Sequence, residues 1–354
     1  MNIEVKININ PKNIPNPETL GFGSIFTDHM FTMDYTEVLG WHNAKIEAYG
    51  PVLLDPSFMV LHYGQETFEG LKAYLGPKGE ALLFRPEMNA KRLNNSNRRL
   101  CIPEIPEEVF MEAIRELIKI DKRWIPSDPG TSLYIRPFVY ATDPSLMVHP
   151  SHSYKFMIVL SPVGAYYKEG INPVKIYVET KYVRASVGGV GFAKTGGNYG
   201  ASLLAQEEAK QKGYSQVLWL DSKEHRYIEE VGTMNVFFVI DDVLITPSLS
   251  GSILPGVTRD SVITIAKSMG IEVKERRVTI DEVICAIEEG RLSEFFGTGT
   301  AAVISPVGEL YYKDTSYPIN EGNIGKLSKK MYETITEIQT GKIQDEFGYK
   351  VVVG

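Results

Sequence analysis

One stretch, residues 164–173, interrupts an otherwise regular succession of strand and helix signals along this 354-residue chain. It combines glycine, proline and polar residues, a composition typical of a linker between domains. On both sides, short apolar runs alternate with segments of helical periodicity, which indicates a mixed α and β fold. We therefore expect a smaller N-terminal α/β domain over residues 1–168, a linker over 169–175 and a larger β-rich domain over 176–354.

Local signals place the individual elements. Pro86 and Pro106 each predict the start of a helix, because proline suits the first helical turn. The helix after Pro106 should bury one face, formed by Val109, Phe110, Ala113, Ile114, Leu117 and Ile118. Strands are predicted over residues 81–84, 132–140, 155–160, 174–180, 216–220, 235–240 and 243–246. Further helices are predicted over 199–212 and about 258–269, 280–289 and 323–340.

Charge and composition exclude several classes of partner. The net charge is −7 and no basic tract stands out, so neither nucleic acid nor an anionic membrane is an expected partner. No apolar run reaches the roughly 18 residues that a membrane-spanning helix needs. The N-terminus has no signal-peptide character, which predicts a cytoplasmic protein.

The metal-ligating side chains show no site signature. The six histidines have no zinc spacing, so no metal is expected. Cys101 and Cys285 are too few for a disulfide scaffold and lie among apolar residues, so both are expected in the core.

Lys194 lies between two glycine clusters in the segment Val187–Gly200. Glycine allows a backbone to approach a ligand closely, so a single cation in such a segment is a candidate ligand contact. Glu230 follows in Glu229–Asn235. A lysine that forms a Schiff base and a carboxylate that keeps a pyridine nitrogen protonated are the minimum that pyridoxal phosphate chemistry requires. On the first segment alone, a glycine loop with a solvated lysine fits equally well.

Two further segments could bind an anion. Leu254–Arg259 leads into an amphipathic helix, and N–H groups at such a helix start can bind phosphate. The turn Phe296–Ala302 contains glycine and threonine and could form an anion nest. Taken singly, each segment also fits an ordinary helix start or turn. The glycine spacing around Lys194 matches neither a P-loop nor a dinucleotide fingerprint.

Together these segments resemble the class IV aminotransferases. The segments that carry this resemblance are residues 230–237, 244–246 and 253–259. Further segments resemble the longer form of the branched-chain amino acid aminotransferases, namely residues 22–30, 61–74, 130–137, 187–200 and 216–220. The match runs from about residue 22 to residue 346. It implies a two-domain fold type IV enzyme, similar to D-amino acid aminotransferase, that holds pyridoxal 5'-phosphate between the domains of a homodimer.

The resemblance also implies roles for individual residues. Lys194 would be the Schiff-base lysine and proton carrier, and Glu230 would pair with the pyridinium nitrogen. Tyr199 would hydrogen-bond the cofactor's phenolic oxygen, and Arg92 would contact its phosphate. The other residues of the implied phosphate site are Val257, Thr258 and Thr300.

Substrate contacts follow from the same resemblance. Backbone N–H groups of Thr233 and Ala301 would bind the substrate carboxylate. The side-chain pocket would be formed by Phe22, Tyr63, Tyr134 and Tyr166, some of them from a partner subunit. Arg136 shares a strand face with Tyr134 and is a candidate for the second carboxylate of a dicarboxylic substrate, although a structural ion pair is equally open.

One departure from the family pattern concerns thiols. Animal relatives carry a Cys-x-x-Cys pair after the Gly-Thr-Ala turn, where this chain has Ala302 and Ser305. Redox control at this position is therefore in doubt.

These features predict a reversible pyridoxal-phosphate-dependent transaminase. Its substrates would be leucine, isoleucine or valine with 2-oxoglutarate, or their oxo acids with glutamate. The alternatives are a D-amino acid aminotransferase or a lyase of the same fold, and, in another class, a non-catalytic protein that binds a phosphate ligand.

Overall fold

The computed structural model describes residues 2–166 and 171–353 and divides the chain into two compact units. Unit 1 comprises Met1–Lys168, Ala193–Gly196 and Glu337–Gly354, and unit 2 comprises Glu169–Phe192 and Gly197–Thr336. Of the predicted linker 169–175, the first two residues lie outside the described residues.

The two units are discontinuous in sequence, whereas the predicted ranges 1–168 and 176–354 are continuous. The C-terminal segment belongs to unit 1 because its last strand, Lys350–Val353, pairs antiparallel with Ala81–Phe84. The segment around Lys194 belongs there because its backbone bonds to Phe68 and Ser96. Pairing between segments so far apart leaves no local signal in the sequence.

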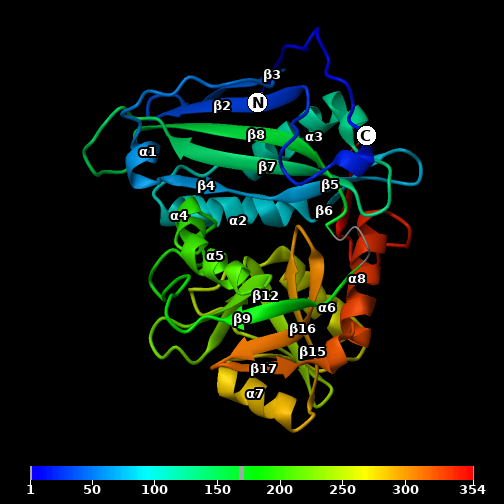
Figure 1. The fold of residues 1–354 in the computed structure, drawn as a ribbon. Coiled ribbons are helices and arrows are strands. Elements are labelled where there is room, and N and C mark those ends of the chain that lie inside the picture. The colour runs from blue at the N-terminus through cyan, green and yellow to red at the C-terminus, as the bar shows by residue number, and fades with distance from the viewer. Residues whose placement is uncertain (1, 167–170, 354) are drawn as a thin grey trace. The chain divides into compact units, whose positions relative to one another are not determined.

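Unit 1 is built on a nine-stranded sheet in the order β1-β3-β2-β8-β7-β5-β6-β18, with β4 paired to β7 (Figure 1). The strands are β1 (Glu4–Val5), β2 (His29–Thr36), β3 (Gly40–Ala48), β4 (Glu66–Phe68), β5 (Leu71–Leu75), β6 (Ala81–Phe84), β7 (Ser132–Ala141), β8 (Ser153–Val163) and β18 (Lys350–Val353). Neighbours are antiparallel except β1 and β3, which are parallel. The helices are α1 (Met59–Tyr63), α2 (Pro86–Arg99) and α3 (Glu107–Ile120), with 3-10 turns at Pro17–Thr19 and Lys122–Trp124.

The core of unit 1 lies where α2 and α3 pack on one face of this sheet. All six residues predicted for the apolar face of α3 are buried, which confirms the helical periodicity. On β7, Leu133 and Ile135 belong to this core. Tyr134 and Arg136 alternate with them, so these two side chains belong to the other face of the sheet.

Unit 2 is built on a second nine-stranded sheet, in the order β11-β10-β9-β16-β15-β12-β13-β14, with β17 on β16. Its strands are β9 (Val174–Val178), β10 (Gln216–Leu220), β11 (Ile228–Val231), β12 (Met234–Ile240), β13 (Val243–Thr246), β14 (Val273–Glu275), β15 (Leu292–Gly299), β16 (Val303–Tyr312) and β17 (Thr315–Pro318). Because β11 pairs with β12 as well as with β10, part of this sheet closes on itself. Phe237 and Phe296 stack in its core with ring centroids 5.3 Å apart.

The helices of unit 2 connect these strands. They are α4 (Gly196–Gly200), α5 (Leu203–Gln211), α6 (Val257–Ser268), α7 (Ile280–Glu288) and α8 (Lys326–Gln339), with a 3-10 turn at Asn320–Gly322. The first residue of α4 and the last three residues of α8 are assigned to unit 1. The helix predicted over 199–212 is two short helices in the structure. The helices predicted over about 258–269 and 280–289 are α6 and α7, and each begins and ends within one residue of those bounds.

The expectation that both cysteines are core residues is wrong, since Cys101 and Cys285 are both exposed and free. Cys101 follows the end of α2 with a φ of 56°. On α7 the buried face is formed by Ile280, Val283 and Ala286, and the helical period turns Cys285 away from it. Apolar neighbours in sequence did not reveal which face each cysteine occupies.

None of the helices in residues 2–166 and 171–353 has both the length and the apolar character needed to cross a membrane.

Candidate active site

The backbone of Lys194 is held on both sides within unit 1. Its N–H donates to Ser96 Oγ at 2.9 Å, and its carbonyl accepts from the N–H of Phe68 at 3.0 Å. Two residues later, Gly196 N–H donates to the carboxylate of Glu66. A Cβ at Gly196 would lie 2.5 Å from that carboxylate, so glycine is required for this approach. Hydrogen bonds therefore hold the backbone of the glycine segment around Lys194 in place, so the segment is not a loop with a solvated lysine.

The surroundings of Lys194 make its amine easy to deprotonate. Burial and, next, the positive charge of Arg92 together lower the pKa of Lys194 to about 8, against the opposing charge of Glu69. Its Nζ lies 4.9 Å from the centre of the Phe68 ring. A partly neutral lysine amine is the form that can attack a carbonyl group.

Arg92 lies on α2 and forms a buried ion pair with Glu69. Its Nε and Nη2 contact the two carboxylate oxygens at 2.7 and 2.9 Å, and Asn89 Nδ2 also donates to Glu69 at 2.8 Å. Burial would raise the pKa of Glu69, but Arg92 outweighs it and holds that pKa below its usual range. The structure thus places the predicted phosphate-binding arginine next to Lys194, fixed by a carboxylate that the sequence did not single out.

Tyr134 and Arg136 come from β7 and extend this cluster. Arg136 Nη2 donates to Tyr134 Oη at 2.8 Å, and the Arg136 guanidinium lies 4.7 Å from the centre of the Phe68 ring. Lys194 and Arg136 therefore flank the same aromatic ring. Phe22 packs edge-on against Tyr134 with centroids 4.9 Å apart.

Arg136 has spare hydrogen-bonding capacity. Its Nε is buried and has no partner within the described part of the chain, where no carboxylate forms an ion pair with it. A buried donor without an acceptor is costly, at roughly 1–3 kcal/mol. This favours a role in binding a carboxylate over the structural ion pair.

Glu230 lies on β11 in unit 2 and is buried. Its Oε1 accepts the N–H of Leu254 at 2.8 Å and lies 3.2 Å from Arg184 Nη2. Arg184 also donates to the carbonyl of Ser252. The carboxylate is therefore held in place by the segment that leads into α6.

Helix α6 starts at Val257, and Thr258 is buried in its first turn. In the part of the chain that the structure describes, no side chain caps this helix start, so its first N–H groups can bind an anion. Gly256 precedes it, and a Cβ there would lie 2.0 Å from Asn235 Oδ1. Asn235 in turn donates to the Leu254 carbonyl at 2.9 Å.

Thr298 adds an unsatisfied hydroxyl to this region. It faces Asn235 in the β12–β15 register, and its buried Oγ1 has no partner among residues 2–166 and 171–353. A phosphate at the start of α6 would supply acceptor oxygens to N–H and O–H groups of this kind. The residues present therefore fit a phosphorylated cofactor.

Two turns carry the predicted backbone donors. Thr233 lies with Gly232 in the turn between β11 and β12, and Thr300 and Ala301 lie in the turn between β15 and β16. Ala302 and Ser305 are buried beside the second turn.

Tyr199 lies at the end of α4 and is partly buried. Tyr63 and Tyr166 are both exposed, and Tyr63 Oη donates to the carbonyl of Leu146. The structure thus brings Phe22 and Tyr134 together with Lys194 in unit 1, but it does not bring Tyr63 into that cluster.

Four residues that the sequence reading missed support these side chains: Glu69, Ser96, Arg184 and Thr298. Each acts through a partner distant in sequence, so no local spacing marks it. Glu69 lies within a segment that resembles the family, and Thr298 lies within the turn Phe296–Ala302, so these two could have been suspected from their motifs.

A separate group of possible metal ligands lies after β7. Asp143, His149 and His152 have ligand atoms within 4.8 Å of one another, and His152 Nδ1 already pairs with Asp143 at 2.8 Å.

Comparisons with known proteins agree on one family. Residues 66–310 match the family model for "Amino-transferase class IV". The chain is 57% identical over 351 residues to "Branched-chain-amino-acid aminotransferase 2" of Bacillus subtilis, covering 99% of this chain and 97% of the relative. It is 50% identical over 354 residues to a "Branched-chain-amino-acid aminotransferase" of Mycolicibacterium smegmatis, covering 98% and 96%.

Solved structures show the same likeness. The crystal structure of an Escherichia coli branched-chain amino acid aminotransferase has a TM-score of 0.78 at 30% identity, covering 92% of this chain and 99% of that chain. The T.th. enzyme of the same name, solved with pyridoxamine 5'-phosphate, has a TM-score of 0.76 at 30% identity, covering 91% and 98%.

Proposed function

The chain belongs to the class IV aminotransferases, as a branched-chain amino acid aminotransferase, and we propose that it uses pyridoxal 5'-phosphate to transfer an amino group between leucine, isoleucine or valine and 2-oxoglutarate. The observation that carries this proposal is Lys194, which has a fixed backbone and a pKa lowered to about 8. The D-amino acid, lyase and non-catalytic alternatives have no observation in their favour.

The cofactor, when bound, supplies an electron sink that stabilises negative charge at the substrate Cα. Lys194 would hold it through its amine and would carry a proton to and from the substrate Cα, a role that suits a group that loses its proton readily. Glu230, buried and oriented by Leu254 N–H, keeps a proton on the pyridine nitrogen. Tyr199 donates to the phenolic oxygen.

The proposed phosphate-binding residues are Arg92, Val257, Thr258, Thr298 and Thr300. Arg92 provides a fixed positive charge, and Val257 and Thr258 provide backbone N–H groups at the start of α6. Thr300 and the unsatisfied hydroxyl of Thr298 complete the set.

The substrate site must accept an apolar side chain in one half-reaction and a carboxylate in the other. Phe22, Tyr134, Tyr63 and Tyr166 provide the apolar walls. Arg136, whose Nε is buried without a partner in the described part of the chain, binds the second carboxylate of 2-oxoglutarate. The backbone at Thr233 and Ala301 binds the α-carboxylate that both substrates share.

We also propose a homodimer, a cytoplasmic location and the two units as the functional domains. Unit 1 exposes large apolar side chains that another subunit could cover, including Val38, Leu53 and the run Leu146–Val148. Both cysteines are free, as expected in a reducing compartment.

Absorption spectroscopy with single amino acids tests the function. Adding L-leucine, L-isoleucine or L-valine should convert the aldehyde form of the cofactor into the amine form, and 2-oxoglutarate should restore it. D-leucine should leave the spectrum unchanged. A response to D-leucine but not to L-leucine would favour the D-amino acid alternative, and a protein without visible absorption would favour the non-catalytic one.

A further inference from the structure

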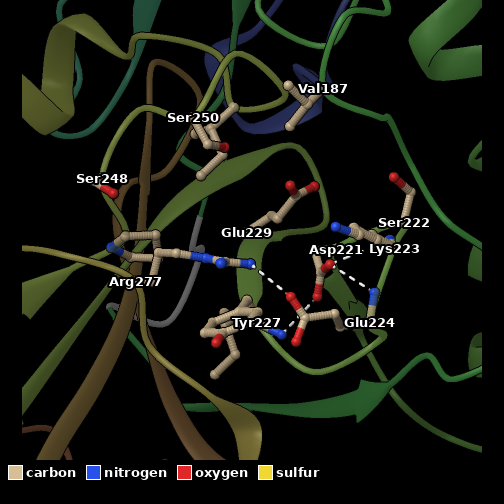
Figure 2. A pocket seen from close by; sticks show the side chains of 13 residues that line it. Val187, Asp221, Ser222, Lys223, Glu224, Tyr227, Glu229, Ser248, Ser250 and Arg277 are labelled. Carbon is tan, nitrogen blue, oxygen red and sulfur yellow. Dashed lines mark hydrogen bonds and ion pairs between the residues drawn. The ribbon is translucent and has the colours of Figure 1, made fainter.

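A cavity of about 520 Å³ lies within unit 2 and is lined by Glu229, the residue next to Glu230 (Figure 2). Glu229 lies at a bulge in the pairing of β10 with β11, and its carboxylate accepts from Ser252, whereas that of Glu230 accepts from Leu254 N–H; Arg184 lies near both carboxylates. The proposed transamination uses neither Glu229 nor this cavity. It is therefore a separate candidate binding site.

Glu229 provides a buried carboxylate, one oxygen of which accepts no hydrogen bond from the described residues. The residue is only 5% exposed, and its Oε1 accepts from the hydroxyl of Ser252. Its Oε2 is buried and has no hydrogen-bond partner in the described parts of the chain. Burial raises the pKa of Glu229, although Ser252 and Arg184 act in the opposite direction. A cationic donor in the cavity would satisfy this oxygen.

Arg277 provides a cation that lines the same cavity. Its guanidinium lies 3.3 Å from the centre of the Tyr227 ring and 3.6 Å from Glu224, in an ion pair whose arginine side chain is 54% exposed. Such an exposed pair is weak, so the guanidinium can exchange Glu224 for a ligand carboxylate. Its planar fork suits a carboxylate better than an ammonium group would.

Asp221 does not compete for a cation in this cavity. Its two oxygens accept four backbone N–H groups, from Lys223 at 3.2 Å, Glu224 at 2.9 Å, Arg226 at 3.0 Å and Tyr227 at 2.8 Å. Burial opposes its charge, but these bonds prevail and lower the pKa of Asp221. The Asp221 carboxylate thus stabilises the loop over residues 221–227. Glu229 is the buried carboxylate of the cavity whose second oxygen accepts no hydrogen bond from the described residues.

The remaining wall of the cavity includes Val187, Pro247 and Ile253. An anion, a cation and apolar side chains in one cavity match the three parts of an amino acid. We propose that this cavity binds an α-amino acid with an apolar side chain, its ammonium group on Glu229 and its carboxylate on Arg277.

Calorimetric titration with L-leucine tests the proposal. The protein is first treated with borohydride, so that no amino group can be transferred. Wild-type protein should show saturable binding. Glu229→Gln and Arg277→Gln should each weaken it at least about tenfold, since each removes one charged hydrogen bond. Arg226→Gln, which removes an exposed arginine outside the cavity, should bind as the wild type does.

Binding of leucine elsewhere in the protein would be the same in all four proteins. Absence of saturable binding would overturn the proposal, and so would wild-type affinity in either Glu229→Gln or Arg277→Gln. If Glu229→Gln does not fold, the surface variant Arg277→Gln decides by the same criterion.

Discussion

Lys194 and Lys72 are both lysines of unit 1 whose pKa is lowered to about 8 by burial. Burial lowers the pKa of Lys72, which lies within β5 opposite Tyr134. Lys194 also has the positive charge of Arg92 beside it and lies in a segment where Gly196 permits close backbone contact. A lowered pKa alone therefore does not distinguish the two lysines, whereas the combination with the glycine segment favours Lys194 as the reactive one.

The pKa of Lys194 predicts how cofactor-free protein reacts with pyridoxal phosphate. Only the neutral amine attacks the aldehyde, so the rate should rise with pH and level off above about 8. Below that value, protonation should lower the rate about tenfold per pH unit. The measurement is the rate of Schiff-base absorbance at a series of pH values, with Lys194→Ala as the unreactive control. A midpoint near 10.5, the value for an ordinary lysine, would contradict the assigned surroundings.

Glu230→Gln keeps the side chain's size and removes its charge. Turnover should fall on the order of 100-fold, because the carboxylate stabilises charge that develops only in the transition state. The amount of bound cofactor should change far less. The assay compares kcat and cofactor content.

Glu272→Gln is the matched control for Glu230→Gln, because Glu272 is an exposed glutamate of the same unit. Glu229 is unsuitable, since the structure shows it buried with a cavity of its own. Unchanged kcat in fully loaded Glu230→Gln would remove Glu230 from the mechanism.

At the scale of elements, the start of α6 depends on Gly256. A Cβ there would displace the side chain of Asn235, which holds the Leu254 carbonyl. Overpacking of this kind costs about 1–3 kcal/mol. Gly256→Ala should therefore weaken cofactor affinity about tenfold or more, as measured by equilibrium dialysis. Gly50→Ala is the control, because among the described residues an added Cβ there meets nothing within 4 Å; equal affinities would argue against a phosphate site at α6.

Elements with strong local signals were predictable. The apolar face of α3 follows from helical periodicity, and the bounds of β6, β10 and β13 follow from short apolar runs. The two-residue gap between the strands predicted over 235–240 and 243–246 is a tight turn in the structure, where Asp241 and Asp242 adopt positive φ, of 51° and 62°. The pairing of β18 with β6 was not predictable, because it joins segments from opposite ends of the chain.

The residues of the candidate site also differ in how far the sequence alone predicts them. Lys194 and Glu230 were found because glycine clusters and a family motif mark them locally. Arg184 carries no such mark, and Thr298 is marked only as part of the turn Phe296–Ala302; the folded chain shows that Arg184 contacts Glu230 and that Thr298 faces Asn235. Motifs thus indicated the groups that we propose react, while tertiary contacts indicated the groups that would support them.

For the whole molecule, we predict a homodimer. Leu53 and Val38 are 99% and 91% exposed, and Leu146, Met147 and Val148 form a further exposed apolar run. Water contact with so much apolar surface is unfavourable, and a second subunit would remove it. Light scattering coupled to gel filtration should give twice the chain mass of 39.6 kDa. A single-chain mass across the concentration range would refute the dimer.

The central claim is that Lys194 carries the cofactor, and borohydride reduction of the holoenzyme followed by peptide mapping tests it most directly. Reduction makes the lysine–cofactor bond permanent, so mass spectrometry of a digest identifies the modified residue. The account predicts the cofactor on the peptide that contains Lys194, with Lys72 unmodified. Cofactor on Lys72, the other lysine whose pKa burial lowers to about 8, would contradict it.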